Sequence, residues 1–144
     1  AERGPHMFLA VSIEMGRAAD WQLQVEQALA HYPVTVLNPR REAWDASWAQ
    51  DLSNPQFVGQ VEWELAAQER ADQILMYFAP TTQAPITLLE LGLFARSGRL
   101  VVCCPPGYWR KGNVDVVCAR YGVPQLPALA DLCDYAAQWA ASAE

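Results

Sequence analysis

Apolar residues along the chain fall into short blocks that alternate with longer segments of helical periodicity. Short, predominantly apolar runs of this kind fit strands that are buried on both faces of a sheet. They lie at residues 7–13, 34–37, 73–78 and 100–104. Helical spacing of apolar residues is found at residues 18–30, 57–71, 86–97 and 114–121, and a last helix is expected at 129–141. The alternation of strands and helices predicts a parallel sheet.

A short fifth strand is expected within Pro124–Pro127. It should lie at an edge of the sheet, because proline cannot donate to a hydrogen-bonded ladder. The sequence therefore predicts an α/β fold with a five-stranded, doubly wound parallel sheet in a single domain, residues 7–144. Residues 1–6 have no apolar signal core and are expected to be an appended segment ahead of a natural start at Met7.

Strand-to-helix loops are the informative segments of such a fold, because ligands bind outside the carboxyl ends of the strands. Here the loops are expected at residues 12–17, 38–55, 79–85 and 105–113. The second of these loops is long, and connections of that length are often functional.

Composition excludes several classes of function. Apolar residues make up 52% of the chain and charged residues 18%, which is typical of a compact globular protein. A net charge of -6 disfavours nucleic acid as a partner, and the apolar stretches are too short to cross a membrane. The four cysteines form no C-x-x-C pair, and only two histidines are present, so a zinc site is not expected. Buried, reduced thiols suit a cytoplasmic protein.

Glu90 stands in the run Pro85-Ile-Thr-Leu-Leu-Glu-Leu-Gly92. If Pro85 opens a helix, as proline prefers, the neighbours of Glu90 on its own face are mostly apolar. Burying a carboxylate there costs several kcal/mol unless it is paired, and such groups concentrate at functional sites. Spacing alone favours a structural ion pair with Arg96 or Arg99, and a catalytic carboxylate is the alternative.

Glu64 lies in the preceding predicted helix, with polar and apolar residues mixed on its face. Taken alone, Glu64 fits a solvated helix face together with Glu62 and Glu69. Two carboxylates at one site would nevertheless suit glycoside chemistry, in which one attacks the anomeric carbon and another group manages the proton of the leaving group.

Further polar residues follow the first two strands. Ser12 and Arg17 could receive a phosphate or a sugar hydroxyl at a helix start, although a serine cap and a surface arginine explain them more simply. In the long loop that begins at Asn38, Trp44 and Asp45 offer a stacking surface and a hydrogen-bonding group for a nucleobase. Packing of that loop on the body explains the tryptophan equally well.

The fourth loop, residues 105–113, concentrates aromatic and basic residues in an otherwise acidic chain. Local positive charge there would favour an anionic group of a substrate.

Three segments together resemble the nucleoside 2-deoxyribosyltransferase superfamily, which also contains 2'-deoxynucleoside 5'-monophosphate N-glycosidases. They are Phe8-Leu-Ala-Val-Ser-Ile-Glu-Met-Gly-Arg17, Ala71-Asp72 ahead of a strand, and Leu89-Glu-Leu-Gly92. The resemblance implies a flavodoxin-like fold, Glu90 as the nucleophile and Glu64 as the acidic residue that assists the base or sugar. It also implies a homodimer or larger homo-oligomer, in which Asn113 is the candidate polar residue that completes a neighbouring subunit's site.

The resulting hypothesis is cleavage of the N-glycosidic bond of a (deoxy)nucleoside through a glycosyl ester of Glu90, with transfer to another base. The alternatives are hydrolysis of (deoxy)nucleoside 5'-monophosphates and a non-catalytic nucleotide-binding module. No metal or cofactor is expected. The predicted substrate-binding residues are Ser12, Arg17, Asn38, Trp44, Asp45 and Asn113.

Overall fold

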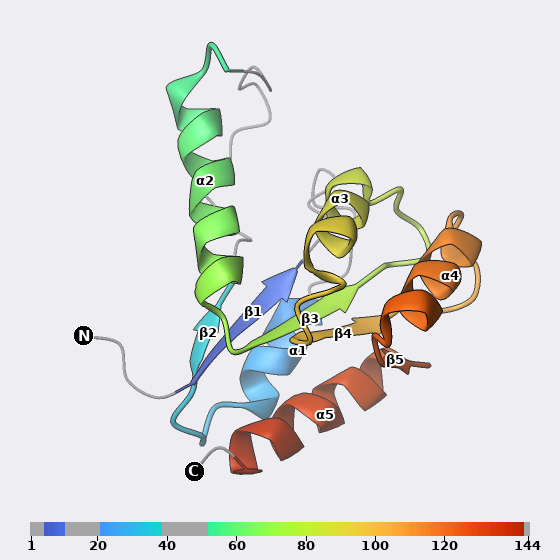
Figure 1. Cartoon of the computed structure of the whole chain (residues 1–144). Coiled ribbons are helices and arrows are strands. Elements are labelled where there is room, and N and C mark those ends of the chain that lie inside the picture. Colours follow the sequence, from blue (N-terminus) through green and yellow to red (C-terminus); the bar gives the residue numbers. More distant parts are fainter. Residues whose placement is uncertain (1–4, 11–20, 39–51, 143–144) are drawn as a thin grey trace.

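The computed structural model describes residues 5–10, 21–38 and 52–142 of the chain, and Figure 1 shows their arrangement. In the described part of the chain, strands and helices alternate. The strands are β1 (His6–Ala10), β2 (Thr35–Leu37), β3 (Gln73–Tyr77), β4 (Leu100–Cys103) and β5 (Gln125–Leu126). The helices are α1 (Trp21–Ala28), α2 (Pro55–Arg70), α3 (Pro85–Phe94), α4 (Lys111–Tyr121) and α5 (Leu129–Ser142).

The strands form one sheet in the order β2-β1-β3-β4-β5, and every neighbouring pair is parallel. This is the flavodoxin-like strand order, so the predicted fold is confirmed. The short strand β5 lies at the edge, where the prolines on either side of it break no ladder. Strand β1 begins at His6, one residue before the predicted start.

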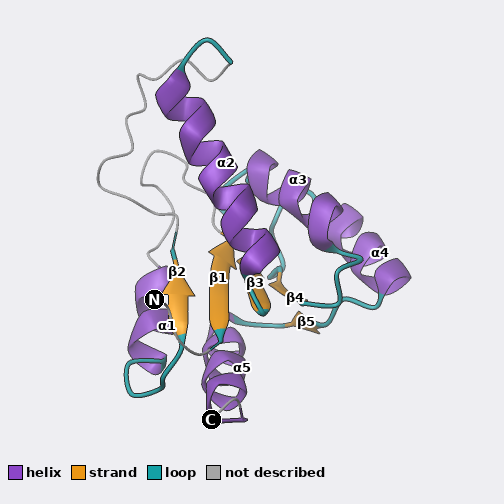
Figure 2. Ribbon diagram, turned by 60° about the vertical axis from the view of Figure 1, so that its left-hand side comes forward, coloured by secondary structure: helices purple, strands orange, loops and turns teal. Residues whose placement is uncertain are grey.

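Two helical layers cover the sheet (Figure 2), with α1 and α5 on one face and α2, α3 and α4 on the other. Successive strand residues point to opposite faces, so Met7 and Leu9 pack toward α1 and α5, whereas Phe8 and Ala10 pack toward α2 and α3. Both faces are therefore core, which explains why the central strands β1, β3 and β4 are mostly apolar and do not alternate with polar residues.

Helix α2 begins at Pro55, two residues before the predicted start. Asn54 caps it, because its side-chain oxygen accepts hydrogen bonds from the backbone N–H groups of Gln56 at 3.0 Å and Phe57 at 3.3 Å. Proline in the first helical position needs no hydrogen-bond acceptor for its nitrogen. The sequence Asn54-Pro55 is thus a helix start that apolar periodicity alone does not reveal.

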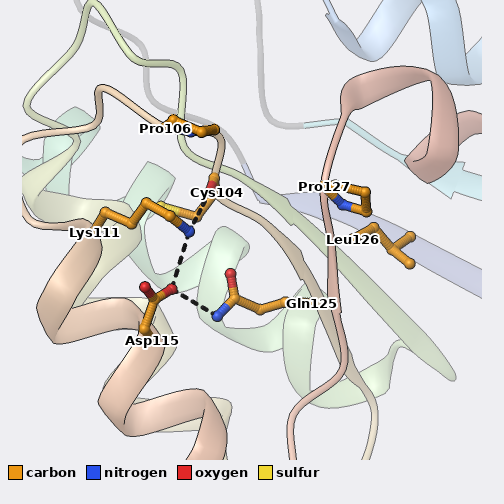
Figure 3. Close-up of a pocket in the computed structure, with 7 residues that line it drawn as sticks. All are labelled: Cys104, Pro106, Lys111, Asp115, Gln125, Leu126 and Pro127. Carbon is orange, nitrogen blue, oxygen red and sulfur yellow. Dashed lines mark hydrogen bonds and ion pairs between the residues drawn. The ribbon is translucent and has the colours of Figure 1, made fainter.

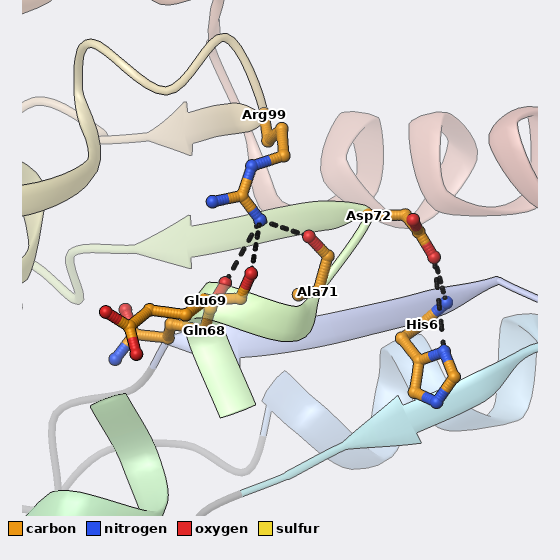
Figure 4. Close-up of polar contacts among 6 residues, drawn as sticks. All are labelled: His6, Gln68, Glu69, Ala71, Asp72 and Arg99. Carbon is orange, nitrogen blue, oxygen red and sulfur yellow. Dashed lines mark hydrogen bonds and ion pairs between the residues drawn. The ribbon is translucent and has the colours of Figure 1, made fainter. Parts of the chain in front are cut away.

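The end of α2 is fixed by Arg99, which lies in the turn before β4 (Figure 4). Its Nη1 donates to the carbonyl oxygens of Gln68 at 3.1 Å, Glu69 at 3.5 Å and Ala71. A cation at these carbonyls satisfies acceptors that a helix leaves unpaired and opposes the negative end of its dipole. Next along the chain, the carboxylate of Asp72 accepts the backbone N–H of His6 at 2.8 Å, which joins the start of β1 to the turn before β3.

No helix among the described residues is both long and apolar enough to cross a bilayer. All four cysteines are free, and three of them, Cys103, Cys104 and Cys118, are buried. Burial raises the pKa of each of these three thiols to about 11, so they remain protonated and unreactive at neutral pH.

Candidate active site

The start of α3 is held by contacts between two loops. Tyr108 donates its hydroxyl proton to the carbonyl oxygen of Gln83 at 2.5 Å, and the indole N–H of Trp109 donates to the same oxygen at 2.9 Å. Ala84 then adopts a left-handed conformation with φ 50°, and Pro85 opens the helix. The aromatic residues of the fourth loop thus position the third loop and the helix that carries Glu90.

Glu90 is buried, with only 4% of its surface exposed. Its carboxylate oxygen Oε2 accepts a hydrogen bond from Nε2 of Gln68 on α2 at 2.8 Å. Arg99 donates instead to the carbonyl oxygens at the end of α2, and the exposed Arg96 lies over the ring of Tyr121 at 6.0 Å from its centroid. The ion pair that spacing favoured is therefore wrong, and Glu90 is a buried acid without a cationic partner among the described residues.

The surroundings of Glu90 raise its pKa from 4.5 to about 8. Desolvation by burial is the main cause, because it penalises the charged form, and the nearby carboxylate of Glu64 adds to the effect. The hydrogen bond from Gln68 acts in the opposite direction, because it stabilises the carboxylate. A carboxyl group with this pKa exchanges its proton close to neutral pH, which is a property of catalytic acids, bases and nucleophiles.

Glu64 lies one helical turn before Gln68 and is half-buried. Its Oε2 accepts a hydrogen bond from Gln60 at 3.2 Å, and its backbone carbonyl accepts one from Nε2 of Gln68 at 3.3 Å. Because Gln68 also contacts Glu90, and Glu64 acts electrostatically on Glu90, the two predicted carboxylates belong to one site. The prediction of a solvated face fits Glu62 and Glu69, which are exposed, but is wrong for Glu64.

This site lies between helices α2 and α3, and its two carboxylates come from helices and not from the strand-to-helix loops, where ligand-binding residues were expected. Two further buried polar residues, Gln68 and Thr87, lie on the same helix faces and were not predicted. Gln68 follows Glu64 by four residues and Thr87 precedes Glu90 by three, so helical spacing places each on the same face as a predicted carboxylate. Both are buried, and the Oε1 atom of Gln68 and the hydroxyl of Thr87 have no hydrogen-bond partner among the described residues.

The predicted substrate-binding residues are only partly within the described structure. Asn38 follows β2, and its side-chain amide donates to Glu26 on α1 at 3.5 Å. Asn113 is exposed in the first turn of α4. The remaining predictions, Ser12, Arg17, Trp44 and Asp45, lie outside the described residues.

A cavity of about 360 Å³ lies at the carboxyl ends of β4 and β5, and Lys111, Asp115 and Gln125 contribute to its lining (Figure 3). Lys111 donates from Nζ to the carbonyl oxygen of Cys104 at 2.9 Å and to Oδ1 of Asp115 at 3.1 Å. Gln125 donates to the same oxygen of Asp115 at 2.9 Å, and these contacts lower the pKa of Asp115. The charge of Lys111 is thus balanced within the protein, so this lysine gives no support to the anion site expected in the fourth loop.

Comparison with known proteins supports both the fold and the resemblance. Among curated proteins none matches. The chain is similar to the crystal structure of a conserved protein from Enterococcus faecalis V583, with a TM-score of 0.62 and 12% identity, covering 95% of this chain and 99% of that one. At this identity the likeness supports the fold alone.

A family model described as "Nucleoside 2-deoxyribosyltransferase like" matches residues 4–108. The matched region contains Glu64, Gln68 and Glu90, whereas Asn113 lies beyond it. Because the match covers most of the sequence, the chain belongs to the nucleoside 2-deoxyribosyltransferase-like family.

Proposed function

We propose that this protein cleaves the N-glycosidic bond of a (deoxy)nucleoside through a covalent glycosyl ester of Glu90 and transfers the sugar to another base. The observation that carries the proposal is the buried Glu90 carboxyl, which has no cationic partner among the described residues and shares its site with Glu64. A buried carboxyl group without a cationic partner lowers the stability of the fold. Its retention is explained by a catalytic role, and the nucleoside 2-deoxyribosyltransferase-like family suggests a chemistry that uses such a group.

In the proposed first step, the ionised carboxylate of Glu90 forms a bond to the anomeric carbon while the bond from that carbon to the base nitrogen breaks. The electron pair of the broken bond goes to the base, which takes a proton from Glu64 or from water. In the second step another base attacks the anomeric carbon, the ester bond to Glu90 breaks and releases the carboxylate, and the N–H proton of the incoming base goes to Glu64 or to water. Each step exchanges one bond at the anomeric carbon for another, and the proton given to the leaving base in the first step is recovered from the incoming base in the second.

We also propose residues other than the two carboxylates that contact the substrate. Ser12, Arg17, Asn38, Trp44 and Asp45 are proposed to bind the base and sugar. The exposed position of Asn113 at the start of α4 leaves it available to a second subunit, and we propose that it completes the site of a neighbour in a homo-oligomer.

The test follows free base by chromatography while the protein is incubated with a panel of deoxynucleosides, with and without an acceptor base. Glu90→Ala is expected to lower base release by about 10³-fold or more, because the nucleophile is lost. Asp115→Asn is the matched control, since it removes a carboxylate outside this site and should leave base release unchanged. Equal base release by wild type and Glu90→Ala would contradict the proposal.

The same panel should include deoxynucleoside 5'-monophosphates, because hydrolysis of these was the first alternative. If base is released only from the monophosphates, and at a rate that does not depend on the acceptor base, the reaction is hydrolysis of monophosphates and not transfer. Saturable nucleotide binding with no base release from any substrate would instead favour the non-catalytic binding module.

A further inference from the structure

Gln68 is fully buried at the centre of the site. The nitrogen and the oxygen of its side-chain amide differ in their hydrogen bonds. Nε2 donates to Oε2 of Glu90 at 2.8 Å and to the carbonyl oxygen of Glu64 at 3.3 Å. Oε1 is buried and has no hydrogen-bond partner among the described residues. The amide nitrogen therefore makes two hydrogen bonds, whereas the amide oxygen makes none with a described residue.

The two acceptors determine how the amide is oriented. If it were flipped, Oε1 would face the carbonyl oxygen of Glu64 and an oxygen of Glu90, and the former contact would be repulsive whatever the charge of Glu90. Nε2 must therefore face Glu90, and Oε1 is left as an unsatisfied buried acceptor, which disfavours folding. A methionine of similar length would avoid that cost, but it would leave Oε2 of the buried Glu90 without this donor, so the glutamine is matched to the Glu90 carboxyl.

The position of Gln68 is also fixed through its backbone. Its carbonyl oxygen accepts a hydrogen bond from Nη1 of Arg99 at 3.1 Å, and the same nitrogen donates to the last carbonyl oxygens of α2 (Figure 4). Arg99 thereby holds the last turn of α2 against the turn before β4. The Gln68 side chain thus extends toward α3 from a rigid base.

On the basis of the function proposed above, we propose that Gln68 is a positioning residue that holds Oε2 of the ionised Glu90 and leaves Oε1 as the atom that attacks the sugar. Oε1 of Glu90 accepts no hydrogen bond from a described residue, so its lone pairs are available. When Oε1 forms the ester, Oε2 becomes the carbonyl oxygen of that ester and can still accept from Nε2. The same hydrogen bond therefore serves both the free enzyme and the covalent intermediate.

The charge of Glu90 depends on the groups that face it. Among the described residues, the charged group that acts on it is Glu64 of α2, which disfavours ionisation, and Gln68 is the group that opposes this effect. Removal of the Gln68 amide should therefore make Glu90 harder to ionise.

The first experiment titrates Glu90 directly by NMR in protein labelled with ¹³C at glutamate carboxyl groups, with the Glu90 signal assigned by its loss in Glu90→Gln. This measurement does not require activity. Gln68→Met is expected to raise the pKa of Glu90 above its wild-type value, whereas the control Gln125→Met removes the equivalent amide from Asp115 and should leave Glu90 unchanged. Gln68→Glu, which keeps the size of the side chain, should also raise the pKa of Glu90 and serves if Gln68→Met does not fold.

The second experiment measures base release and thermal unfolding of the same variants. At pH 7, Gln68→Met is expected to release base at least about tenfold more slowly, which corresponds to a pKa rise of one unit. Its thermal unfolding should remain cooperative, which separates this effect from loss of the fold. An unchanged Glu90 titration in a folded Gln68 variant overturns the proposal, and so does a shifted titration with unchanged base release. Absence of base release from wild type would contradict the proposed function and the attacking role of Oε1, while the titration still decides whether Gln68 controls Glu90.

Discussion

Glu90 and Asp115 both accept a hydrogen bond from a glutamine side chain, but their pKa values move in opposite directions. Glu90 is buried, its charged neighbour is another carboxylate, and its pKa is raised to about 8. Asp115 keeps 46% of its side chain exposed, is bonded to Lys111 as well as Gln125, and has a lowered pKa.

The amide donor is common to both carboxylates, and its effect has the same sign in both: it favours the charged form. Solvation and the charge of the nearest ionised neighbour are what differ. At Glu90 the hydrogen bond from Gln68 does not offset desolvation and the neighbouring carboxylate, so the pKa of Glu90 stays raised. Asp115, with Lys111 and Gln125 beside it, is thus favoured in its charged form, whereas Glu90 is favoured in its neutral form until the pH reaches about 8.

The largest effect is expected on the free energy of unfolding when the Glu90 carboxyl is replaced. Because the pKa of Glu90 is raised, the group disfavours folding above pH 4.5, and the penalty grows with pH until about pH 8 and is constant beyond. Glu90→Gln should therefore stabilise the protein by a few kcal/mol at pH 8 and by almost nothing at pH 4. Denaturant unfolding across this range measures it, and a variant that is less stable than wild type at pH 8 would contradict the assigned environment.

An effect of intermediate size is expected on the pKa of Glu90 when the charge of its neighbour Glu64 is removed. Glu64→Gln removes the carboxylate that disfavours ionisation of Glu90, so the pKa of Glu90 should fall below about 8. The acid limb of kcat/KM for base release should move to lower pH with it, and each unit of movement raises the ionised fraction at low pH about tenfold. The position of the limb is the readout, since loss of a proton donor lowers the rate at every pH. A limb that stays in place would show that Glu64 does not act on Glu90.

The smallest effect is expected at the exposed carboxylate. Asp115 has a lowered pKa, so its ionised form adds stability above pH 3.8, and this contribution is lost as pH falls through the lower, folded-state value. Exposure and salt screen its contact with Lys111, so Asp115→Asn should cost less than about 1 kcal/mol at pH 7. Urea unfolding at low and high salt provides the measurement. A loss of several kcal/mol would mean that Asp115 is not the solvated counterpart of Glu90.

Much of the fold could be predicted from the sequence because strands buried on both faces of a sheet consist mostly of apolar residues. The blocks at residues 73–78 and 100–104 correspond to β3 and β4 within a residue, and Pro124 and Pro127 correctly indicated an edge strand. Helix starts were less accurate. Asn54 extends α2 by capping it, and α4 begins at Lys111, three residues before the predicted start.

The candidate site was predicted less completely than the fold. Glu90 and Glu64 could be singled out, but spacing alone favoured Arg96 or Arg99 as an ionic partner for Glu90. Arg99 follows Glu90 closely in sequence, yet the chain turns into β4 between them, and its guanidinium reaches the end of α2 instead. Gln68 carried no signal beyond its helical spacing from Glu64.

By itself, the sequence determined which segments become strands and helices, because local periodicity, proline and asparagine caps act over a few residues. Resemblance to known motifs added the identity of the two carboxylates. Only the tertiary structure decided their environment, because burial and the choice of neighbours depend on how α2 and α3 pack on the same face of the sheet. That packing places the amide of Gln68 and the carboxylate of Glu64 beside Glu90, and no cationic side chain among the described residues pairs with it.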